Sequence, residues 1–375
     1  MELIKRSLEN TIKKSIFKGK AVFIFGARQV GKTTLIKQIT SGLDKKTKFF
    51  VGDAQADRQI LLPKSVNYLK NLVGDAEIII IDEAHKFDEI DNTIKLLVDN
   101  FKGKQIIATG SSAFILKSKT SDSLAGRKRT FNLYPLSFKE LSDFHGFDEE
   151  LRQLDMRLIY GSYPEVVITD EKRQTLDDIR ESYLFKDILE WEGIRKSQKI
   201  VKLLTALALQ IGSQVRYREL AGLVGLDPVT VEKYIDILEQ SFIIYRLPSF
   251  SRNLRNELKF SRKIFFWDLG IRNSLISNFN PLDLRSDIGA MWENYVITEL
   301  IKHRYYQQKD CQFYFWRTQQ AQEIDLIEIC NGSINAYEIK WNPRQKPKFH
   351  RTFSKAYPEA KLHFINRDNF WDFIN

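Results

Sequence analysis

One stretch of nine residues combines two glycines, a lysine and a threonine at a spacing that suits phosphate binding. The pattern is G-x-x-x-x-G-K-T, in which Gly26 and Gly31 are followed by Lys32 and Thr33. Glycines let the backbone bend so that several N–H groups point inward at an anion. Lys32 is expected to reach the β- and γ-phosphates of ATP, and Thr33 to bind Mg²⁺. The predicted nucleotide contacts are Gly26, Ala27, Arg28, Gln29, Val30, Gly31, Lys32, Thr33 and Thr34.

A pair of carboxylates follows the most apolar stretch of the chain. Residues 78–81 are four consecutive isoleucines, and Asp82 and Glu83 come directly after them. At the end of a buried strand, Asp82 is expected to hold Mg²⁺ at the ATP site and Glu83 to polarise the attacking water. An acidic N-cap for the next helix is the alternative. Residues 82–85 also spell the signature of one helicase class, but no second motor domain is recognisable.

Two further positions could act on the γ-phosphate. Ser111 follows the apolar run 105–109, and a polar residue at such a strand tip can position the attacking water. An ordinary turn serine is the equal alternative. Arg127 lies in the basic stretch 123–129 and is the predicted arginine finger, often supplied across a subunit boundary. A solvated basic loop would produce the same composition.

A second chemical constellation lies near the C-terminal end. Asp325 and Glu338 fall on two strand-like runs that are expected to pair as a hairpin around residues 330–333. Lys340 is two residues after Glu338 and therefore on the same face of its strand. Carboxylates that hold Mg²⁺ or Mn²⁺ beside a lysine can cleave phosphodiesters, and Glu293 is a possible extra ligand. The pattern is similar to the core of restriction-endonuclease-like nucleases, although Ile324 stands where that group often has proline, and a charged solvent face is the alternative.

Composition narrows the class of protein. The 375 residues carry a formal net charge of +10, which weakly favours an anionic partner such as DNA. The two cysteines, Cys311 and Cys330, have no neighbours at metal-ligand spacing, so neither a disulfide framework nor a zinc module is expected. The N-terminal residues lack the apolar core of a signal peptide, and no run is long enough to span a membrane. A cytoplasmic protein with no membrane partner is predicted.

The phosphate-binding and catalytic residues need a sheet to hold them in position. The continuous apolar run 21–25 predicts a buried parallel strand, and largely apolar runs predict further strands at 49–51, 76–81 and 105–109. A helix is expected over residues 2–18. Farther along, Asp227 and Pro228 suit the start of a helix after a tight turn, which predicts a winged helix-turn-helix. That second helix is acidic. The basic residues come later, and the predicted basic wing consists of Arg246, Arg252, Arg255, Lys259, Arg262 and Lys263.

The motifs together resemble a known group. Residues 26–34, 82–84, 109–112, 126–127 and 133–140 are similar to those of a widespread family of bacterial and archaeal AAA-type ATPases, whose C-terminal half is a domain of unknown function. The likeness continues through residues 160–166 and 265–270, so it spans nearly the whole chain. The resemblance implies an AAA-type fold, oligomerisation and Mg-ATP. It implies no cellular role.

The expected architecture is α/β with four parts. These are a P-loop ATPase domain over 1–140, a helical lid or connector over 141–196, a winged helix over 197–250 and a restriction-endonuclease-like domain over 251–375. The function that this favours is a Mg-ATP-dependent ATPase that forms a homo-oligomer and acts on DNA, with or without metal-dependent cleavage. The alternative is an ATP-gated binding or signalling module with an inactive nuclease-like domain. A processive helicase is a weaker hypothesis, since no strand-separating element is recognisable.

Overall fold

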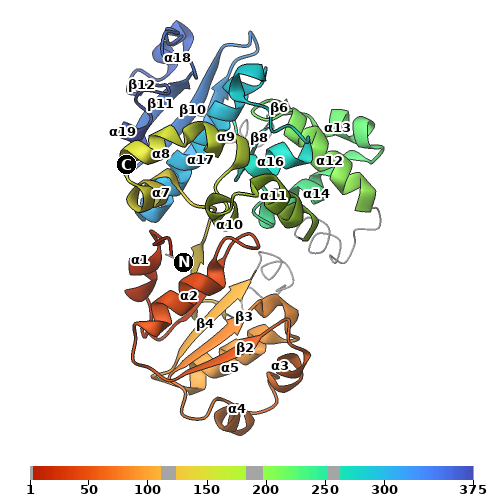
Figure 1. Cartoon of the computed structure of the whole chain (residues 1–375), viewed down its shortest axis with the longest axis vertical. Helices are drawn as coiled ribbons and strands as arrows, with labels where there is room; N and C mark the ends of the chain where they lie inside the picture. Colours follow the sequence, from red (N-terminus) through yellow and green to blue (C-terminus); the bar gives the residue numbers. More distant parts are fainter. Residues whose placement is uncertain (1–2, 111–123, 183–196, 252–261, 375) are drawn as a thin grey trace. The chain divides into compact units, whose positions relative to one another are not determined.

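The computed structural model describes residues 3–110, 124–182, 197–251 and 262–374, which divide into two compact units (Figure 1). The first unit comprises Met1–Tyr134 and Gln240–Phe242, and the second comprises Pro135–Glu239 and Ile243–Asn375. The phosphate-loop motif therefore belongs to the first unit and the acidic constellation to the second.

A parallel sheet lies at the centre of the first unit. Its strands are β1 (Ala21–Phe25), β2 (Thr47–Val51), β3 (Ile78–Asp82), β4 (Gln105–Gly110) and β5 (Lys128–Asn132). They run in the order β2-β3-β4-β1-β5, and each neighbouring pair is parallel. β1 is buried along its length and the four isoleucines of β3 are all buried, as their continuous apolar runs predict. Because β4 lies between β1 and β3, the carboxyl ends of these three strands are neighbours.

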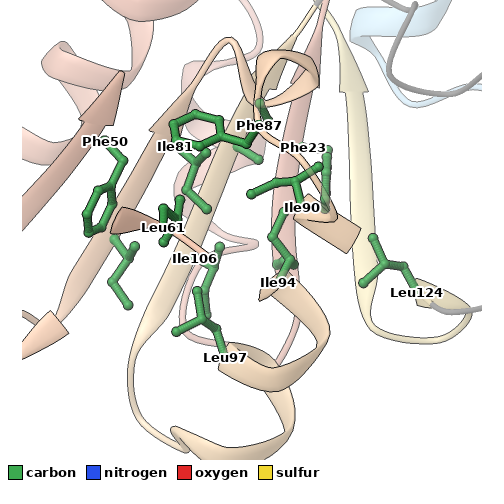
Figure 2. Packing of buried hydrophobic residues seen from close by; sticks show 14 of the residues in the cluster. Phe23, Phe50, Leu61, Ile81, Phe87, Ile90, Ile94, Leu97, Ile106 and Leu124 are labelled. Carbon is green, nitrogen blue, oxygen red and sulfur yellow. The ribbon is translucent and has the colours of Figure 1, made fainter. Parts of the chain in front are cut away.

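Helices pack against this sheet. They are α1 (Glu9–Lys13), α2 (Lys32–Ser41), α3 (Gln55–Ile60), α4 (Val66–Val73) and α5 (Ile90–Asn100), with a 3-10 turn, η1 (Ala84–Lys86). Figure 2 shows side chains of α5 in one apolar cluster with side chains of the sheet. Ile90, Ile94 and Leu97 follow the i, i+4, i+7 spacing of one helix face. Fully burying each contributes about 1.5–3 kcal/mol, so this face fixes α5 on the sheet.

The N-terminal helix is shorter than the sequence predicts. A helix was expected over residues 2–18, whereas α1 covers five residues. The hydroxyl of Ser15 donates to the carbonyl oxygen of Thr11 at 2.8 Å, a bond that competes with the helical ladder. Phe17 then takes a positive φ of 57°, which ends any helical path. The longer helix was wrong because the apolar stripe alone does not reveal these local backbone preferences.

The second unit begins with a run of short helices. They are α7 (Phe138–His145), α8 (Phe147–Arg152), α9 (Leu154–Tyr160), α10 (Pro164–Ile168) and α11 (Lys172–Arg180). α7 starts with a reciprocal cap, in which Glu140 N donates to Ser137 Oγ at 3.2 Å and Ser137 N donates to Glu140 Oε2 at 2.9 Å. Pro164 is at the first turn of α10, where its missing N–H has no cost.

Three helices and a small sheet follow. They are α12 (Ser197–Leu209), α13 (Tyr217–Val224) and α14 (Pro228–Gln240), with β6 (Gln214–Val215), β7 (Ile244–Leu247) and β8 (Arg262–Phe266) in the order β6-β8-β7. Both strand pairs are antiparallel. The predicted start of α14 is confirmed, since Asp227 Oδ1 accepts a hydrogen bond from Thr230 N at 2.9 Å and Pro228 is the first helical residue.

The rest of the second unit contains a four-stranded sheet. Its elements are α16 (Leu269–Leu275), η4 (Leu282–Leu284), α17 (Ile288–Tyr306), β9 (Cys311–Arg317), β10 (Glu323–Cys330), β11 (Ser333–Ile339), α18 (Arg351–Ala356), β12 (Lys361–Ile365) and α19 (Trp371–Ile374). The strand order is β12-β11-β10-β9, and β10 and β11 form the predicted antiparallel hairpin. Cys311 and Cys330 are paired residues of β9 and β10 and are joined in a disulfide, which the sequence did not predict.

A buried carboxylate joins two parts of the second unit. Asp268 Oδ2 accepts a hydrogen bond from Ser162 N at 2.7 Å, and its Oδ1 caps α16 through Ile271 N at 3.1 Å. A Cβ atom at Gly161 would lie 2.1 Å from Asp268 Oδ1, and Gly161 also has a φ of +74°. Glycine is therefore required here both by the close approach and by the backbone conformation.

Gly161→Ala should lower the free energy of unfolding by about 3 kcal/mol or more, because it displaces Asp268 from two hydrogen bonds to a charged group. Gly146→Ala is the matched control, since Gly146 has a φ of +91° but a Cβ atom placed there would meet nothing within 4 Å. Only backbone strain of about 1–2 kcal/mol is expected there. Urea unfolding followed by circular dichroism measures both changes, and equal losses would contradict the steric explanation.

Candidate functional site

The phosphate loop lies between β1 and α2 and depends on glycine at both ends. A Cβ atom at Gly26 would lie 2.2 Å from the carbonyl oxygen of Leu133, so no larger residue fits. Gly31 has a φ of 95° and is the N-cap of α2, which begins at Lys32. The positive end of α2 therefore faces the loop, as expected of a site that binds phosphate.

Lys32 is held inside the loop. It is only 5% exposed, and its Nζ donates to the carbonyl oxygens of Gly26 at 3.0 Å and Ala27 at 2.9 Å. The same ammonium lies 3.9 Å from Glu83 Oε1. The structure thus brings together the predicted lysine and the predicted catalytic carboxylate at one point of the loop.

A carboxylate with two hydroxyl donors occupies the adjoining strand ends. Thr33 Oγ1 lies 2.9 Å from Asp82 Oδ2, and Thr109 Oγ1 donates to Asp82 Oδ1. Thr109 Oγ1 also accepts a hydrogen bond from Glu83 N at 2.9 Å. Asp82 and Thr33 offer the oxygen ligands that Mg²⁺ prefers. Thr109 was not predicted from the sequence, although a polar residue within the apolar run 105–109 was an available signal.

Glu83 and His85 form a second contact beside the lysine. Glu83 has a left-handed backbone, with φ 49° and ψ 51°, as the N-cap of η1. Its Oε2 lies 3.3 Å from His85 Nδ1. Burial lowers the pKa of His85 to about 4, even though the Glu83 carboxylate opposes this shift. The imidazole is therefore neutral near pH 7 and leaves the Glu83 carboxylate unneutralised on that side.

A buried arginine supports the loop from outside the motif. The Nη1 of Arg6 donates to the carbonyl oxygen of Val30 at 2.7 Å, and its Nη2 donates to that of Tyr134 at 2.6 Å. Arg6 is 5% exposed. It connects the N-terminal segment to the phosphate loop, and no sequence motif marks it.

Of the two residues predicted to act on the γ-phosphate, Ser111 and Arg127, the structure describes only Arg127. Ser111 lies outside the described residues. Arg127 lies at the amino-terminal end of strand β1, because its carbonyl oxygen accepts a hydrogen bond from Ala21 N at 2.9 Å. Its side-chain Nε donates to Asp99 Oδ1 at 2.7 Å. The phosphate loop follows the other end of β1, about 16 Å away along five residues of strand. A role at its own chain's loop is excluded, and a role at the loop of a neighbouring copy stays a prediction.

The predicted basic wing is partly neutralised. Arg246 Nη1 contacts Asp236 Oδ1 at 2.7 Å, and its Nε donates to Glu239 Oε2 at 2.7 Å. Lys263 is 2% exposed and faces carboxylates. Lys263 is buried against these acids, whereas Arg246 is partly exposed beside its acids. Contact of the wing with phosphate, or a winged helix that only packs against other domains, stays a prediction. Three other members of the wing, Arg252, Arg255 and Lys259, lie outside the described residues.

The acidic constellation is brought together in the second unit. Lys340 Nζ lies 2.9 Å from Asp325 Oδ2 and 3.0 Å from Glu338 Oε2. Glu293 of α17 joins them, because one carboxylate oxygen each of Glu293, Glu323 and Asp325 lie within 4.8 Å of one another. Glu323 was not predicted from the sequence, although it is two residues before Asp325 and so on the same face of β10.

A second lysine enters this cluster from β8. Lys263 Nζ donates to Glu293 Oε1 at 2.8 Å and forms an ion pair with Glu323. Burial would lower the pKa of Lys263, but the carboxylates of Glu293, Glu323 and Asp325 outweigh it and raise the pKa above its ordinary value. The pairing of β8 with this cluster was not visible in the sequence.

The carboxylates of the cluster are also perturbed. Burial, reinforced by the charge on Asp325, raises the pKa of Glu338 to about 7. Burial also raises the pKa of Glu293 to about 7, against the opposing effect of Lys263. Acids with perturbed pKa values are typical of functional sites, and they also occur in structural ion-pair networks.

Comparisons with known families divide the chain into three segments. Residues 18–142 match the family described as "AAA domain". Residues 151–282 match a domain of unknown function (DUF8612), and residues 288–369 match another (DUF4143).

Relatives and solved structures extend this result. An uncharacterized protein of Haemophilus influenzae is 26% identical, with 75% of this chain and 74% of that protein covered. An uncharacterized protein of Mycobacterium tuberculosis is 23% identical, and the match covers 96% of this chain and 79% of that protein. An uncharacterized protein of Methanocaldococcus jannaschii is also 23% identical, and the match covers 98% of this chain and 86% of that protein.

Among solved structures, the Walker-type ATPase of Pyrococcus abyssi has a TM-score of 0.49 at 14% identity, covering 73% of this chain and 96% of that one. The Aeropyrum pernix ORC1 protein in complex with DNA has a TM-score of 0.34 at 11% identity, covering 74% and 93%.

Across the described ranges, none of the helices is long and apolar enough to cross a membrane.

The loop geometry and the family match agree on the first unit, whereas the second unit matches families without an assigned function. The chain carries an AAA-type P-loop ATPase domain, followed by a C-terminal domain of unknown function, DUF4143.

Proposed function

We propose that the protein is a Mg-ATP-dependent ATPase that acts on DNA as a homo-oligomer. The observation that carries the ATPase part is the contact of Asp82 with Thr33 and Thr109 at the carboxyl ends of β3, β1 and β4. These groups lie beside Lys32 and Glu83, which are 3.9 Å apart. The arrangement combines phosphate binding, cation binding and a carboxylate in one place.

Each residue has a separate role in this proposal. Backbone N–H groups of the loop and the ammonium of Lys32 bind the phosphates, while Thr33 and Asp82 would hold Mg²⁺. Bound Mg²⁺ neutralises charge on the phosphate oxygens. The carboxylate of Glu83 accepts a hydrogen bond from the attacking water and orients it. Thr109 fixes the backbone of Glu83 through the 2.9 Å bond to Glu83 N, so that the carboxylate keeps its direction.

Glu83→Gln should lower ATP turnover at least about 100-fold while leaving ATP binding intact, because the amide cannot act as a base. The matched control is Glu89→Gln, which makes the same change at an exposed glutamate that also has a positive φ. Phosphate release measures turnover, and binding of a fluorescent ATP analogue measures affinity. Equal turnover by Glu83→Gln and the unchanged protein would contradict the assignment.

The action on DNA is supported by the charge of the chain and by the local fold of the second unit. The net charge of +10 favours an anionic partner, and the tight turn between α13 and α14 with the β6-β8-β7 sheet is consistent with a winged helix. We assign the ATPase to 1–140, a helical lid to 141–196, the winged helix to 197–250 together with its strand β8, and a nuclease-like domain to the rest of 251–375. In a homo-oligomer, Arg127 would contact the loop of a neighbouring copy.

A second activity is favoured by the acidic cluster. Glu293, Asp325 and Glu338 with Lys340 lie together, with Glu323 added, and carboxylates of this kind can hold Mg²⁺ or Mn²⁺ for phosphodiester cleavage. Lys340 would stabilise negative charge on the phosphate. The alternative is an ATP-gated binding or signalling module, in which the same ion pairs only stabilise the fold.

Cleavage is tested with plasmid, single-stranded and branched DNA in Mg²⁺ or Mn²⁺. If the cluster is catalytic, Glu338→Ala should reduce cutting at least about 100-fold, because it removes a cation ligand. Lys32→Ala should retain the cutting, since it belongs to the other unit. Asp310→Ala, at an exposed acid, is the control for charge alone. The absence of cutting with every DNA would favour the binding module.

A further inference from the structure

A cavity of about 580 Å³ lies in the second unit beside the acidic cluster. It forms where the chain after β7 runs along β9. Phe250 N donates to the carbonyl oxygen of Phe315 at 2.6 Å, and Phe315 N donates to that of Pro248 at 2.9 Å. These two bonds hold residues 248–250 against the strand. A cavity of this size is within the range of small-molecule sites.

The charge of the lining favours an anion. Arg216 and Arg317 both line the cavity, and none of the described residues that line it carries a carboxylate. Arg216 is exposed and is the N-cap of α13, which has no side-chain cap, so the positive end of this helix is on the same side. Guanidinium groups bind phosphate oxygens in a bidentate manner.

The opposite part of the lining is aromatic. Phe250, Trp316 and Tyr357 contribute, and the rings of Phe250 and Tyr357 are 5.0 Å apart. Phe250 is partly exposed, whereas Tyr357 is buried. A partly exposed ring supported by a buried one is a suitable surface for a planar base, and such stacking contributes about 1–3 kcal/mol per base.

A buried serine also belongs to the lining of the cavity. Ser249 lines the cavity and is 8% exposed, and within the described part of the chain its Oγ has no hydrogen-bond partner. Leaving a buried hydroxyl without a partner costs about 1–3 kcal/mol.

The cavity adjoins the acidic cluster directly. Arg317 Nη1 contacts Glu323 Oε2 at 3.0 Å, and the ring of Phe315 lies 5.6 Å from Lys263 Nζ. A ligand bound here would therefore lie next to the carboxylates of the second site. Aromatic rings and two guanidinium groups are together the recognition chemistry of a nucleotide.

We propose that this cavity binds a nucleotide, with the base against Phe250 and the phosphate at Arg216 and Arg317. The nucleotide is either free or part of a single strand, because both have the same base and phosphate. The proposal names the chemical form of DNA that the second unit recognises, and it rests on the proposed action on DNA but not on ATP hydrolysis.

The test uses the full chain carrying Lys32→Ala, in EDTA and without ATP, so that the phosphate loop does not contribute. Fluorescence anisotropy measures binding of a labelled oligothymidylate of about 12 nucleotides. Arg216→Ala should weaken binding at least about tenfold, because it removes a phosphate contact. Arg218→Ala is the matched control, since it removes the same charge at an exposed arginine two residues along, which does not line the cavity.

Phe250→Leu tests the base contact separately. Leucine keeps apolar packing against Tyr314 and Tyr357 but removes the aromatic face, so binding should weaken at least about fivefold with circular dichroism unchanged. Competition with thymidine monophosphate distinguishes the two sources. Displacement shows that a free nucleotide is sufficient, and its failure shows that a strand is needed, so either result supports the cavity as a nucleotide site.

Two results would overturn the proposal. One is equal weakening by Arg216→Ala and Arg218→Ala, which would mean that only general charge attracts the strand. The other is the absence of binding by both the oligonucleotide and the monophosphate. Neither result concerns ATP turnover, which is measured on the chain with Lys32 intact, so the failure of this proposal and of the ATPase proposal are distinguishable.

Discussion

The first unit depends on one carboxylate that accepts hydrogen bonds from two hydroxyls. Asp82 receives Thr33 from α2 and Thr109 from β4, and these contacts join three neighbouring strand ends. They are possible because β4 is inserted between β1 and β3. The same Thr109 accepts a hydrogen bond from Glu83 N, which helps to hold the left-handed backbone of Glu83. Strand order, cation ligands and the catalytic carboxylate are therefore parts of one arrangement.

In the second unit, a group of buried or half-buried carboxylates is stabilised by lysine side chains. Four carboxylates, Glu293, Glu323, Asp325 and Glu338, are close to the ammonium groups of Lys263 and Lys340. Arg317 also contacts Glu323, so three positive charges face four negative ones, which is consistent with the raised pKa of Glu293 and Glu338. Partial protonation near neutral pH relieves the repulsion. The cluster is thus stable without requiring all its acids to be ionised.

Local patterns in the sequence predicted the parts of both sites that lie within one motif or one hairpin. The phosphate loop and Asp82 follow apolar runs, and the period of two places Asp325, Glu338 and Lys340 on one face. Residues that act across long sequence distances were not predicted. Arg6 reaches Val30 and Tyr134, and Lys263 reaches Glu293, through tertiary packing that no motif encodes. The sequence also did not predict that Arg127 lies at the amino-terminal end of the strands, because strand register decides at which end of the sheet a residue lies.

The contacts of Lys263 bear on both hypotheses for the second unit, which are metal-dependent cleavage and a binding module without cleavage. Its ammonium contacts Glu293 and Glu323, which are two of the three carboxylates that lie close enough together to hold a divalent cation. Exchanging one positive charge for two is favourable among four carboxylates, but it leaves a buried ammonium without its partners. With Lys263 in place, the cluster supports the fold beside the cavity that faces Arg216 and Arg317. A divalent cation at these carboxylates would therefore compete with Lys263, while Lys340 keeps its contacts with Asp325 and Glu338.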